Sequence, residues 1–218
     1  MTWVVTQDAG ERRTRVLVFG ASGRTGSLVV KESLDRGYQV LAFVRNPSKL
    51  DLSHPQLTVV QGDVRSAADV DLVVQRADVV VSVLGRAPGS SLDICSVGVA
   101  NIVDSMSKHG VKRLICLSDY GNGETRTRGL YARVLWHIIR AHLEDKEKME
   151  ETVKSSNLSW TIIRPTILTD GAKTGSYKVG PEIKIGLVPK ISRHDVADFI
   201  ARQVTDDSFI HSSPSISY

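Results

Sequence analysis

Three glycines at a fixed spacing form the motif in this sequence that most clearly indicates chemistry. Gly20, Gly23 and Gly26 lie in the stretch GASGRTG, between an apolar run over residues 15–19 and a helical pattern over residues 25–36. Gly20 permits a sharp turn, Gly23 lets the backbone approach a pyrophosphate, and Gly26 lets the helix pack closely on the strand. The free N–H groups and the positive dipole end of the helix then face the phosphates. We therefore expect these residues to bind a dinucleotide: Gly20, Ser22, Gly23, Arg24, Thr25 and Gly26.

The end of a second apolar run, residues 39–44, indicates which dinucleotide would bind. This run completes a βαβ unit, which favours the nucleotide-binding interpretation over a purely structural glycine turn. An acidic residue at this point usually binds the ribose hydroxyls of NAD(H), but the sequence has Arg45. A guanidinium matches the shape and charge of a phosphate, so we expect Arg45 and Arg24 to clamp the 2′-phosphate of NADP(H). In the alternative, Arg45 only begins a solvated loop over residues 45–49.

Strands and helices alternate along the chain, which predicts a single-domain α/β protein with a Rossmann fold, a doubly wound parallel sheet. Apolar runs such as residues 78–85 are typical of the buried strands of parallel sheets. The predicted strands cover residues 15–19, 39–44, 57–60, 78–85, 112–118 and 160–165. The predicted helices cover residues 25–36, 67–76, 92–109, 131–155 and 193–204, the last with Ser192 as a candidate cap.

Ligands of such a sheet bind beyond the carboxyl ends of its strands, so the residues that follow each strand are candidate contacts. We expect Asp63 and Val64 to lie near the adenine of the cofactor. We expect Leu84, Gly85 and Arg86 to lie beside the nicotinamide ribose. Asp63 has an alternative role as a turn or capping residue.

Three further segments flank or interrupt this pattern. Residues 1–14 predict a flexible extension that precedes a domain over residues 15–218. Residues 166–191 are rich in glycine and proline, with short β-like pieces such as residues 183–185, and predict a substrate lid at the ligand end of the sheet. The polar residues 205–218 predict either a disordered tail or a surface strap.

The composition is that of an ordinary globular protein, with 218 residues, of which 41% are hydrophobic and 24% charged. The net charge of +4 is modest and the arginines are dispersed, so we expect no nucleic-acid partner. Cys95 and Cys116 lack metal-like spacing and suit a core in a reducing compartment, which predicts a cytoplasmic protein without a metal site. No apolar run is long enough to cross a membrane. We expect a monomer or a homodimer.

Five stretches of the sequence together resemble one family. They are residues 20–26 (GASGRTG), 44–45 (VR), 62–64 (GDV), 156–165 (SNLSWTIIRP) and 191–197 (ISRHDVA). With them, residues 15–212 resemble the atypical short-chain dehydrogenase/reductases that have an NmrA-like, NAD(P)H-binding Rossmann domain. Residues 174–177 (TGSY) and 191–197 narrow the similarity to the small flavin reductase and biliverdin-IXβ reductase type.

This resemblance implies roles for residues near the nicotinamide. Ser118, at the end of a predicted strand, takes the place of the serine that such enzymes put there, and its hydroxyl can donate to a carbonyl oxygen as hydride arrives. Lys146 falls at the lysine of the superfamily's Tyr-xxx-Lys pair, but His142 stands at the tyrosine position. Pro165 is implied as a further cofactor contact. The departure at His142 leaves the proton donor open between this histidine, other tyrosines and water.

His142 and Lys146 also share one side of the helix predicted over residues 131–155. They are one helical turn apart and lie beside its apolar stripe, so we expect both to face the protein. Histidine suits proton transfer because its unperturbed pKa is about 6.5. We therefore expect Ser118, His142 and Lys146 to be catalytic, whereas charged neighbours such as Asp145 form a solvated face. The structural alternative is a core histidine and a lysine that extends along the sheet edge.

Three functions are compatible with these expectations. The first is an NADPH-dependent reductase that transfers hydride to a flat, conjugated small molecule such as a flavin, tetrapyrrole, quinone or polyketide. The second is a dinucleotide-binding sensor without turnover, as some NmrA-like proteins are. The third is a pathway enzyme that uses the fold for cyclisation or isomerisation, with His142 as acid or base. The retention of Ser118, His142 and Lys146 favours the reductase.

The residue after the second predicted strand provides a test of cofactor choice. We expect NADPH to bind more tightly than NADH, because the Arg45 guanidinium gains charge-assisted hydrogen bonds of about 1.5–3 kcal/mol from the 2′-phosphate. Arg45→Asp should reverse this preference. Calorimetric titration with both cofactors measures it, and equal affinities in the unaltered protein would contradict the expectation.

Overall fold

The computed structural model describes residues 13–86, 91–125, 140–185 and 189–218. Most of the extension predicted at residues 1–14, and the start of the helix predicted over residues 131–155, lie outside these ranges. Among the helices in the described ranges, none combines the length and the apolar character needed to cross a membrane.

The centre of the structure is an eight-stranded sheet with the strand order β3-β2-β1-β4-β5-β6-β10-β8. The first six strands of the chain are parallel to one another. They are β1 (Arg15–Phe19), β2 (Gln39–Val44), β3 (Leu57–Gln61), β4 (Val79–Ser82), β5 (Arg113–Leu117) and β6 (Ser159–Pro165). Their order reverses between β1 and β4, which is the order of a dinucleotide-binding Rossmann fold. The predicted fold is confirmed, and the predicted strands differ from these only at their ends.

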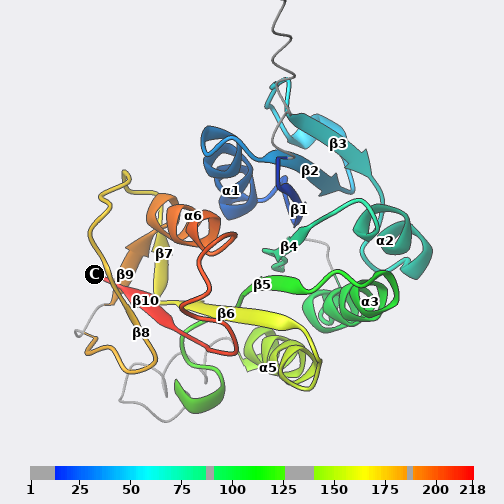
Figure 1. The fold of residues 1–218 in the computed structure, drawn as a ribbon. Helices are drawn as coiled ribbons and strands as arrows, with labels where there is room; N and C mark the ends of the chain where they lie inside the picture. Colours follow the sequence, from blue (N-terminus) through cyan, green and yellow to red (C-terminus); the bar gives the residue numbers. More distant parts are fainter. Residues whose placement is uncertain (1–12, 87–90, 126–139, 186–188) are drawn as a thin grey trace, which may run out of the picture.

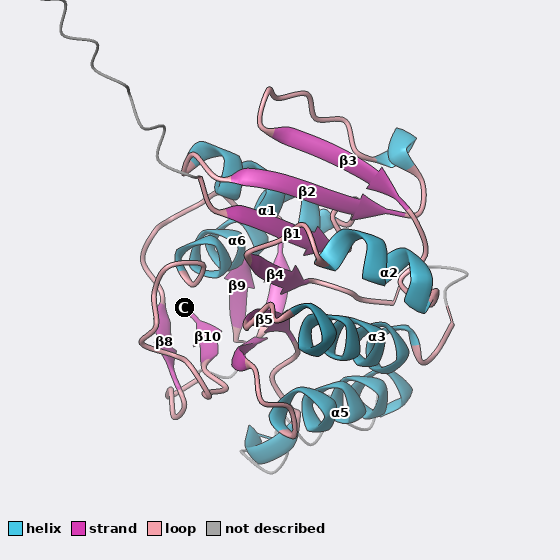
Figure 2. Cartoon of the chain, turned by 45° about the vertical axis from the view of Figure 1, so that its right-hand side comes forward, coloured by secondary structure: helices cyan, strands magenta, loops and turns pink. Residues whose placement is uncertain are grey.

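Helices cover both faces of this sheet (Figure 1). α1 (Arg24–Asp35) and α6 (Arg193–Arg202) pack on one face, and α2 (Ala67–Val74), α3 (Ile94–His109) and α5 (Arg140–Lys154) pack on the other. α3 and α5 lie side by side in Figure 2. In β1, Val16 and Val18 join the core under α1 and α6, whereas Leu17 and Phe19 join the opposite core. Both faces of the strand are buried from Val16 to Phe19, and these four residues are all apolar.

Local sequence sets two of the helix ends. α3 ends at Gly110, whose φ of 71° lies in the left-handed region that favours glycine. α6 begins after Ser192, whose hydroxyl accepts a hydrogen bond from the N–H of His194 at 3.2 Å, and this confirms the predicted cap. Two short 3₁₀ helices, η1 (Pro47–Lys49) and η2 (Gly123–Thr125), lie in loops.

The C-terminal segment is a strand of the sheet, and not the disordered tail or surface strap predicted for residues 205–218. β10 (Ser215–Ser217) runs parallel to β6, and on its other side it pairs with the antiparallel β8 (Lys178–Gly180). Its central residue, Ile216, is fully buried. The sequence hides this strand because it is short and its two outer positions are serines, so no apolar run marks it.

The segment predicted as a lid, residues 166–191, is partly ordered into strands and fastened to α6. β7 (Ile167–Thr169) pairs with β9 (Lys190–Ser192), and β8 lies between them in the chain. Residues 183–185, predicted as β-like, are irregular instead. Asp195 of α6 accepts hydrogen bonds from the backbone N–H groups of Thr174 and Gly175 at 2.9 and 2.8 Å. These bonds hold the middle of the segment against the helix.

The interior position of β10 can be tested by stability measurements. Ile216→Ala should lower the free energy of unfolding by about 2–5 kcal/mol, because removing a buried side chain leaves a cavity. The control is Val59→Ala, at a β3 valine that is 39% exposed, and it should have a much smaller effect. Urea titration measures both variants, and equal losses would argue against a buried β10.

Candidate functional site

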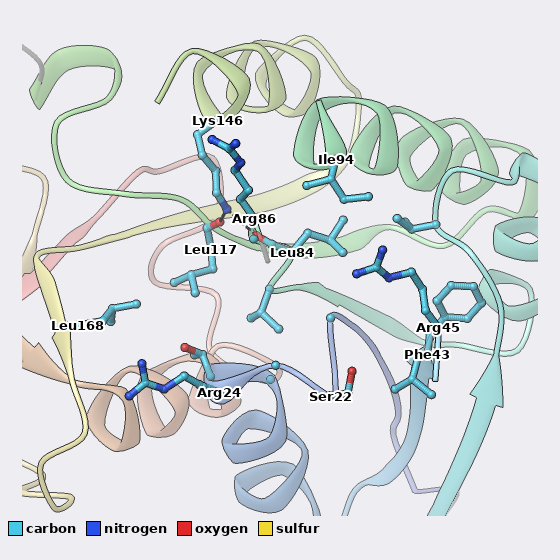
Figure 3. Close-up of a pocket in the computed structure, with 18 of the residues that line it drawn as sticks. Ser22, Arg24, Phe43, Arg45, Leu84, Arg86, Ile94, Leu117, Lys146 and Leu168 are labelled. Carbon is cyan, nitrogen blue, oxygen red and sulfur yellow. Dashed lines mark hydrogen bonds between the residues drawn. The ribbon is translucent and has the colours of Figure 1, made fainter. Parts of the chain in front are cut away.

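A cavity of about 660 Å³ lies at the carboxyl ends of the parallel strands (Figure 3). Residues that follow β1, β2, β3, β4 and β5 all line it, so it spans the point between β1 and β4 where the strand order reverses. Ligands of doubly wound sheets bind at this point. The predicted site residues that line the cavity are Gly20, Ser22, Gly23, Arg24, Thr25, Gly26, Arg45, Val64, Leu84, Gly85, Arg86, Ser118, His142 and Lys146.

The turn after β1 requires glycine at two positions. Gly20 has a φ of 78°, and a Cβ there would lie 2.8 Å from the carbonyl oxygen of Val83. A Cβ on Gly26 would lie 2.0 Å from the carbonyl oxygen of Gly20, so α1 approaches the turn more closely than a side chain permits. At Gly23, the N-cap of α1, a Cβ would lie 3.2 Å from the same oxygen, so this glycine mainly keeps space open at the cavity. The N-terminus of α1 is thus available to a phosphate.

Arg45 and Lys49, from the short segment that follows β2, both line the cavity with positive charges. Figure 3 shows Arg45 beside Phe43, where β2 ends. The loop between the two cations is ordered, because Asn46 caps η1 by accepting a hydrogen bond from the N–H of Ser48 at 3.1 Å. Lys49 was not predicted as a site residue. The sequence could have indicated it, because Asn46 and Pro47 favour the start of a helical turn, and this turn brings Lys49 to the cavity. Two cations from one short segment of the cavity lining suit a phosphate dianion.

Arg24 lies across the cavity from Arg45 (Figure 3). The predicted clamp requires the two arginines to lie together, and in the structure they do not. Figure 3 shows the side chain of Arg24 directed towards Leu168. Its guanidinium forms an ion pair with Asp170, directly after β7. The prediction relied on the position of Arg24 in the glycine turn, but the first residue of α1 points towards β7. Lys49, four residues after Arg45, is the second cation that this segment contributes to the cavity lining.

Asp63 and Pro165 are not among the described residues that line the cavity. The carboxylate of Asp63 accepts a hydrogen bond from the N–H of Arg65 at 2.9 Å, which is the alternative role of a turn residue. Pro165 is buried at the end of β6. Gly62 and Val64, on either side of Asp63, do line the cavity.

Ser118 lines the cavity, but its hydroxyl belongs to a buried ionic cluster. Its Oγ donates to Oε1 of Glu150 at 2.6 Å, and Glu150 is ion-paired with Arg164. The two charged side chains are at most 3% exposed. Burial opposes the charge of Arg164, but the hydrogen bond with Glu150 helps to raise its pKa above the ordinary value. In this arrangement the Ser118 hydroxyl donates its hydrogen bond to Glu150 of α5 and does not donate to a ligand.

His142 and Asp119 form a hydrogen-bonded pair on the cavity wall. Nε2 of His142 lies 3.0 Å from Oδ2 of Asp119, and the side chains are 22% and 25% exposed. Burial opposes the ionisation of Asp119, yet the hydrogen bond with His142 and the charge of Lys146 lower its pKa. An ionised Asp119 accepts this hydrogen bond and so orients the imidazole at the cavity. Asp119 was not predicted, although it stands two residues after the end of β5, where the sequence could have indicated a candidate contact.

Lys146 lies one turn further along α5 and connects the ends of two strands. Its Nζ donates to the carbonyl oxygens of Leu84 and Leu117 at 2.7 and 2.6 Å. Burial opposes its charge, but the surrounding groups, with Cys95 and Asp119 the strongest, raise its pKa. The ammonium therefore supports β4 and β5 at the same place where it lines the cavity.

Asp145, predicted on the solvated face of this helix, is buried instead. Its two carboxylate oxygens accept hydrogen bonds from the backbone N–H groups of Cys95 and Ser96, each at 2.9 Å. These N–H groups belong to the first turn of α3, so Asp145 caps that helix and complements its dipole. The cap fixes α5 against α3, which helps to hold His142 and Lys146 at the cavity.

The fold and the cavity define a Rossmann protein that binds a dinucleotide. A model of the NAD(P)H-binding protein family matches residues 20–207. The chain belongs to this family, and the resemblance to NmrA-like, atypical short-chain dehydrogenase/reductases is thereby confirmed.

One curated protein and two solved structures are similar to this chain at low sequence identity. The chloroplastic Arabidopsis thaliana protein At2g34460 is 30% identical over 179 residues, which cover 77% of this chain and 64% of that protein. The structure of ChuY, an anaerobilin reductase from Escherichia coli O157:H7, has a TM-score of 0.78 at 23% identity and covers 93% of this chain and 96% of ChuY. A short-chain dehydrogenase/reductase from Veillonella parvula in complex with NADP has a TM-score of 0.74 at 19% identity, with 94% of each chain covered. At these identities the two structures show the fold alone.

Two glycines of the turn predict different outcomes on substitution. Gly23→Val should keep the fold and abolish NADPH binding, because its side chain occupies the space that the pyrophosphate needs. Gly26→Ala should destabilise the protein itself, because its Cβ would lie 2.0 Å from a backbone oxygen. Calorimetry with NADPH and thermal melting separate the two effects. Normal NADPH affinity in Gly23→Val would mean that the phosphates bind elsewhere.

Proposed function

We propose that the protein is an NADPH-dependent reductase that transfers hydride to a flat, conjugated acceptor. The observation that carries this proposal is the His142–Asp119 pair, because it puts a proton-transfer group into the same cavity as the glycine turn and Arg45. A protein that only binds a dinucleotide needs no such group, whereas reduction of a conjugated double bond needs a proton as well as a hydride.

The residues along the cavity fit NADPH. The glycine turn leaves room for the pyrophosphate at the N-terminus of α1. Arg45 and Lys49 supply two cations for the 2′-phosphate. Bound NADPH would supply the hydride.

Apolar side chains form part of the cavity wall and suit a planar ring system. Leu84, Ile94, Leu117 and Leu168 contribute them (Figure 3). Such a wall covers the faces of a conjugated ring and excludes water from them. ChuY, which has the same fold, is an anaerobilin reductase, and this supports a tetrapyrrole or a comparable conjugated molecule as the acceptor.

In this proposal His142 donates the proton and Asp119 orients its ring. The acceptor gains one hydride and one proton, which leaves the imidazole neutral after each turnover. The side chain of His142 is 22% exposed, so it can recover its proton from water. Lys146 holds the ends of β4 and β5 in place beside the reacting groups.

A dinucleotide-binding sensor is the second candidate, and two sets of hydrogen bonds favour it. The Ser118 hydroxyl donates to Glu150, and the Lys146 ammonium donates to two carbonyl oxygens. Two polar groups that the family resemblance assigns to the reaction are thus engaged within the protein. Turnover distinguishes the candidates: the full chain is mixed with NADPH and a panel of flavins, quinones and tetrapyrroles, and the loss of NADPH absorbance is followed. Tight NADPH binding without oxidation by any of them supports the sensor.

Replacement of the proposed proton donor provides the sharper test. His142→Ala should lower turnover about 10²–10⁴-fold, the usual contribution of a general acid, with little change in NADPH affinity. His54→Ala is the control, because His54 is exposed and does not line the cavity. Steady-state rates and calorimetry measure the two effects. Full turnover in His142→Ala across neutral pH would assign the proton to water or to another side chain.

A further inference from the structure

We infer that Arg24 and Arg193 bind a carboxylate of the acceptor, so that the substrate is a flat, conjugated organic acid. The inference rests on the proposed function, since it concerns the acceptor end of the same cavity. To the proposed function it adds a carboxylate substituent on the acceptor and two residues, Arg24 and Arg193, that select for this substituent.

Two guanidiniums already share one carboxylate at this end of the cavity. Arg24 is the first residue of α1 and Arg193 is the first residue of α6, and both line the cavity. Nη1 of Arg193 lies 2.7 Å from Oδ1 of Asp170, and Nη2 of Arg24 contacts Oδ2 of the same side chain. Two guanidiniums at the starts of two helices suit the carboxylate of a ligand equally well. The Asp170 carboxylate thus occupies the position that we assign to the carboxylate of the acceptor.

The position of the pair separates it from the cofactor's 2′-phosphate. Figure 3 shows Arg24 beside Leu168 and across the cavity from Arg45. Asp170 follows β7, and β7 pairs with β9, which leads directly into Arg193. The two arginines therefore adjoin the apolar wall where the acceptor ring would bind. An acidic substituent at the edge of that ring would meet them.

Most of the charged side chains that line the cavity are basic, which suits anionic ligand groups. Six basic side chains and one acidic side chain line it within the described residues: Arg24, Arg45, Lys49, Arg86, Lys146 and Arg193 against Asp119. The 2′-phosphate accounts for Arg45 and Lys49, and Lys146 is engaged by the strand ends. At the other end Asp170 balances Arg24 and Arg193, and an acceptor carboxylate that replaced Asp170 would take over this balance.

Asp170 can leave the arginines without disturbing the fold. The side chains of Arg24 and Asp170 are 67% and 59% exposed, and an ion pair so exposed contributes little to stability. Arg193 is only 15% exposed, so its charge needs a partner, which the acceptor carboxylate supplies once it replaces Asp170. The backbone beside Asp170 is held separately, because Ser192 and His194 contact the carbonyl oxygen of Gly171. An acceptor carboxylate can therefore replace that of Asp170 while the segment stays in place.

A matched pair of probes tests this inference by binding alone. Naphthoate and its neutral methyl ester are titrated by calorimetry into the full chain saturated with NADPH. Naphthoate should bind about tenfold more tightly than the ester, because charge-assisted hydrogen bonds form with the carboxylate only. Arg193→Gln should remove this difference and leave the affinity for the ester unchanged.

Asp170→Asn should have the opposite effect, which a purely structural ion pair would not produce. Removing the competing carboxylate should strengthen naphthoate binding several-fold at unchanged NADPH affinity. Arg202→Gln is the control, because Arg202 lies on the same helix and pairs with Asp198 at 2.9 Å away from the cavity lining. This variant should leave both affinities unchanged.

Three results would overturn the anion site: equal affinities for naphthoate and its ester, no gain in naphthoate affinity in Asp170→Asn, or loss of NADPH binding in Arg193→Gln. The last would assign the arginine to the cofactor. Because none of these measurements needs turnover, the proposed reductase activity is judged separately. Selective naphthoate binding without oxidation of NADPH by any acceptor would refute the reductase and retain the anion site.

Discussion

The close approach of α1 to the turn after β1 is the contact on which the site depends. Because Gly26 has no side chain, the helix can pack against the carbonyl group of Gly20, and its N-terminus reaches the carboxyl end of a central strand. α1 packs in turn against α6, which carries Arg193 and follows β9. One approach of backbone to backbone therefore sets the positions of both the phosphate end and the acceptor end of the cavity.

Buried charges on α5 set the opposite wall. Asp145 caps α3, Lys146 joins the ends of β4 and β5, and Glu150 binds Ser118 and Arg164. Each charge has partners, and it must have them, because removing one member of a buried ion pair costs about 3–5 kcal/mol. A helix rich in charged residues thus becomes a fixed support for His142.

The sheet and the phosphate turn could be predicted from the sequence because their signals are local. Apolar runs mark the parallel strands, and the spacing of Gly20, Gly23 and Gly26 marks the turn. The pairings between distant side chains could not be predicted, since periodicity along α5 does not tell a solvated acid such as Glu144 from Asp145, which caps another helix. The pairing of Arg24 with Asp170 could not be predicted either, because it depends on where β7 packs.

β10 was hidden for a different physical reason. Its burial comes from its neighbours β6 and β8, whereas its own residues are mostly small and polar. A strand of this kind carries little hydrophobic signal, although the sheet buries it completely. The strength of a sequence signal therefore measures what a segment contributes to the core, and not whether it lies there.

The order of the central strands also bears on how quickly the protein folds. β1 pairs with β4, and the contact between Arg15 and Asp78 beside this pairing closes a separation of 63 residues. Closing so long a loop costs chain entropy before native contacts offset it, which slows folding. Since Gly20 packs against the carbonyl group of Val83, the phosphate turn is complete only after β4 has joined the sheet. A bound dinucleotide would therefore leave the rate of folding almost unchanged and prolong the lifetime of the native state by slowing its unfolding.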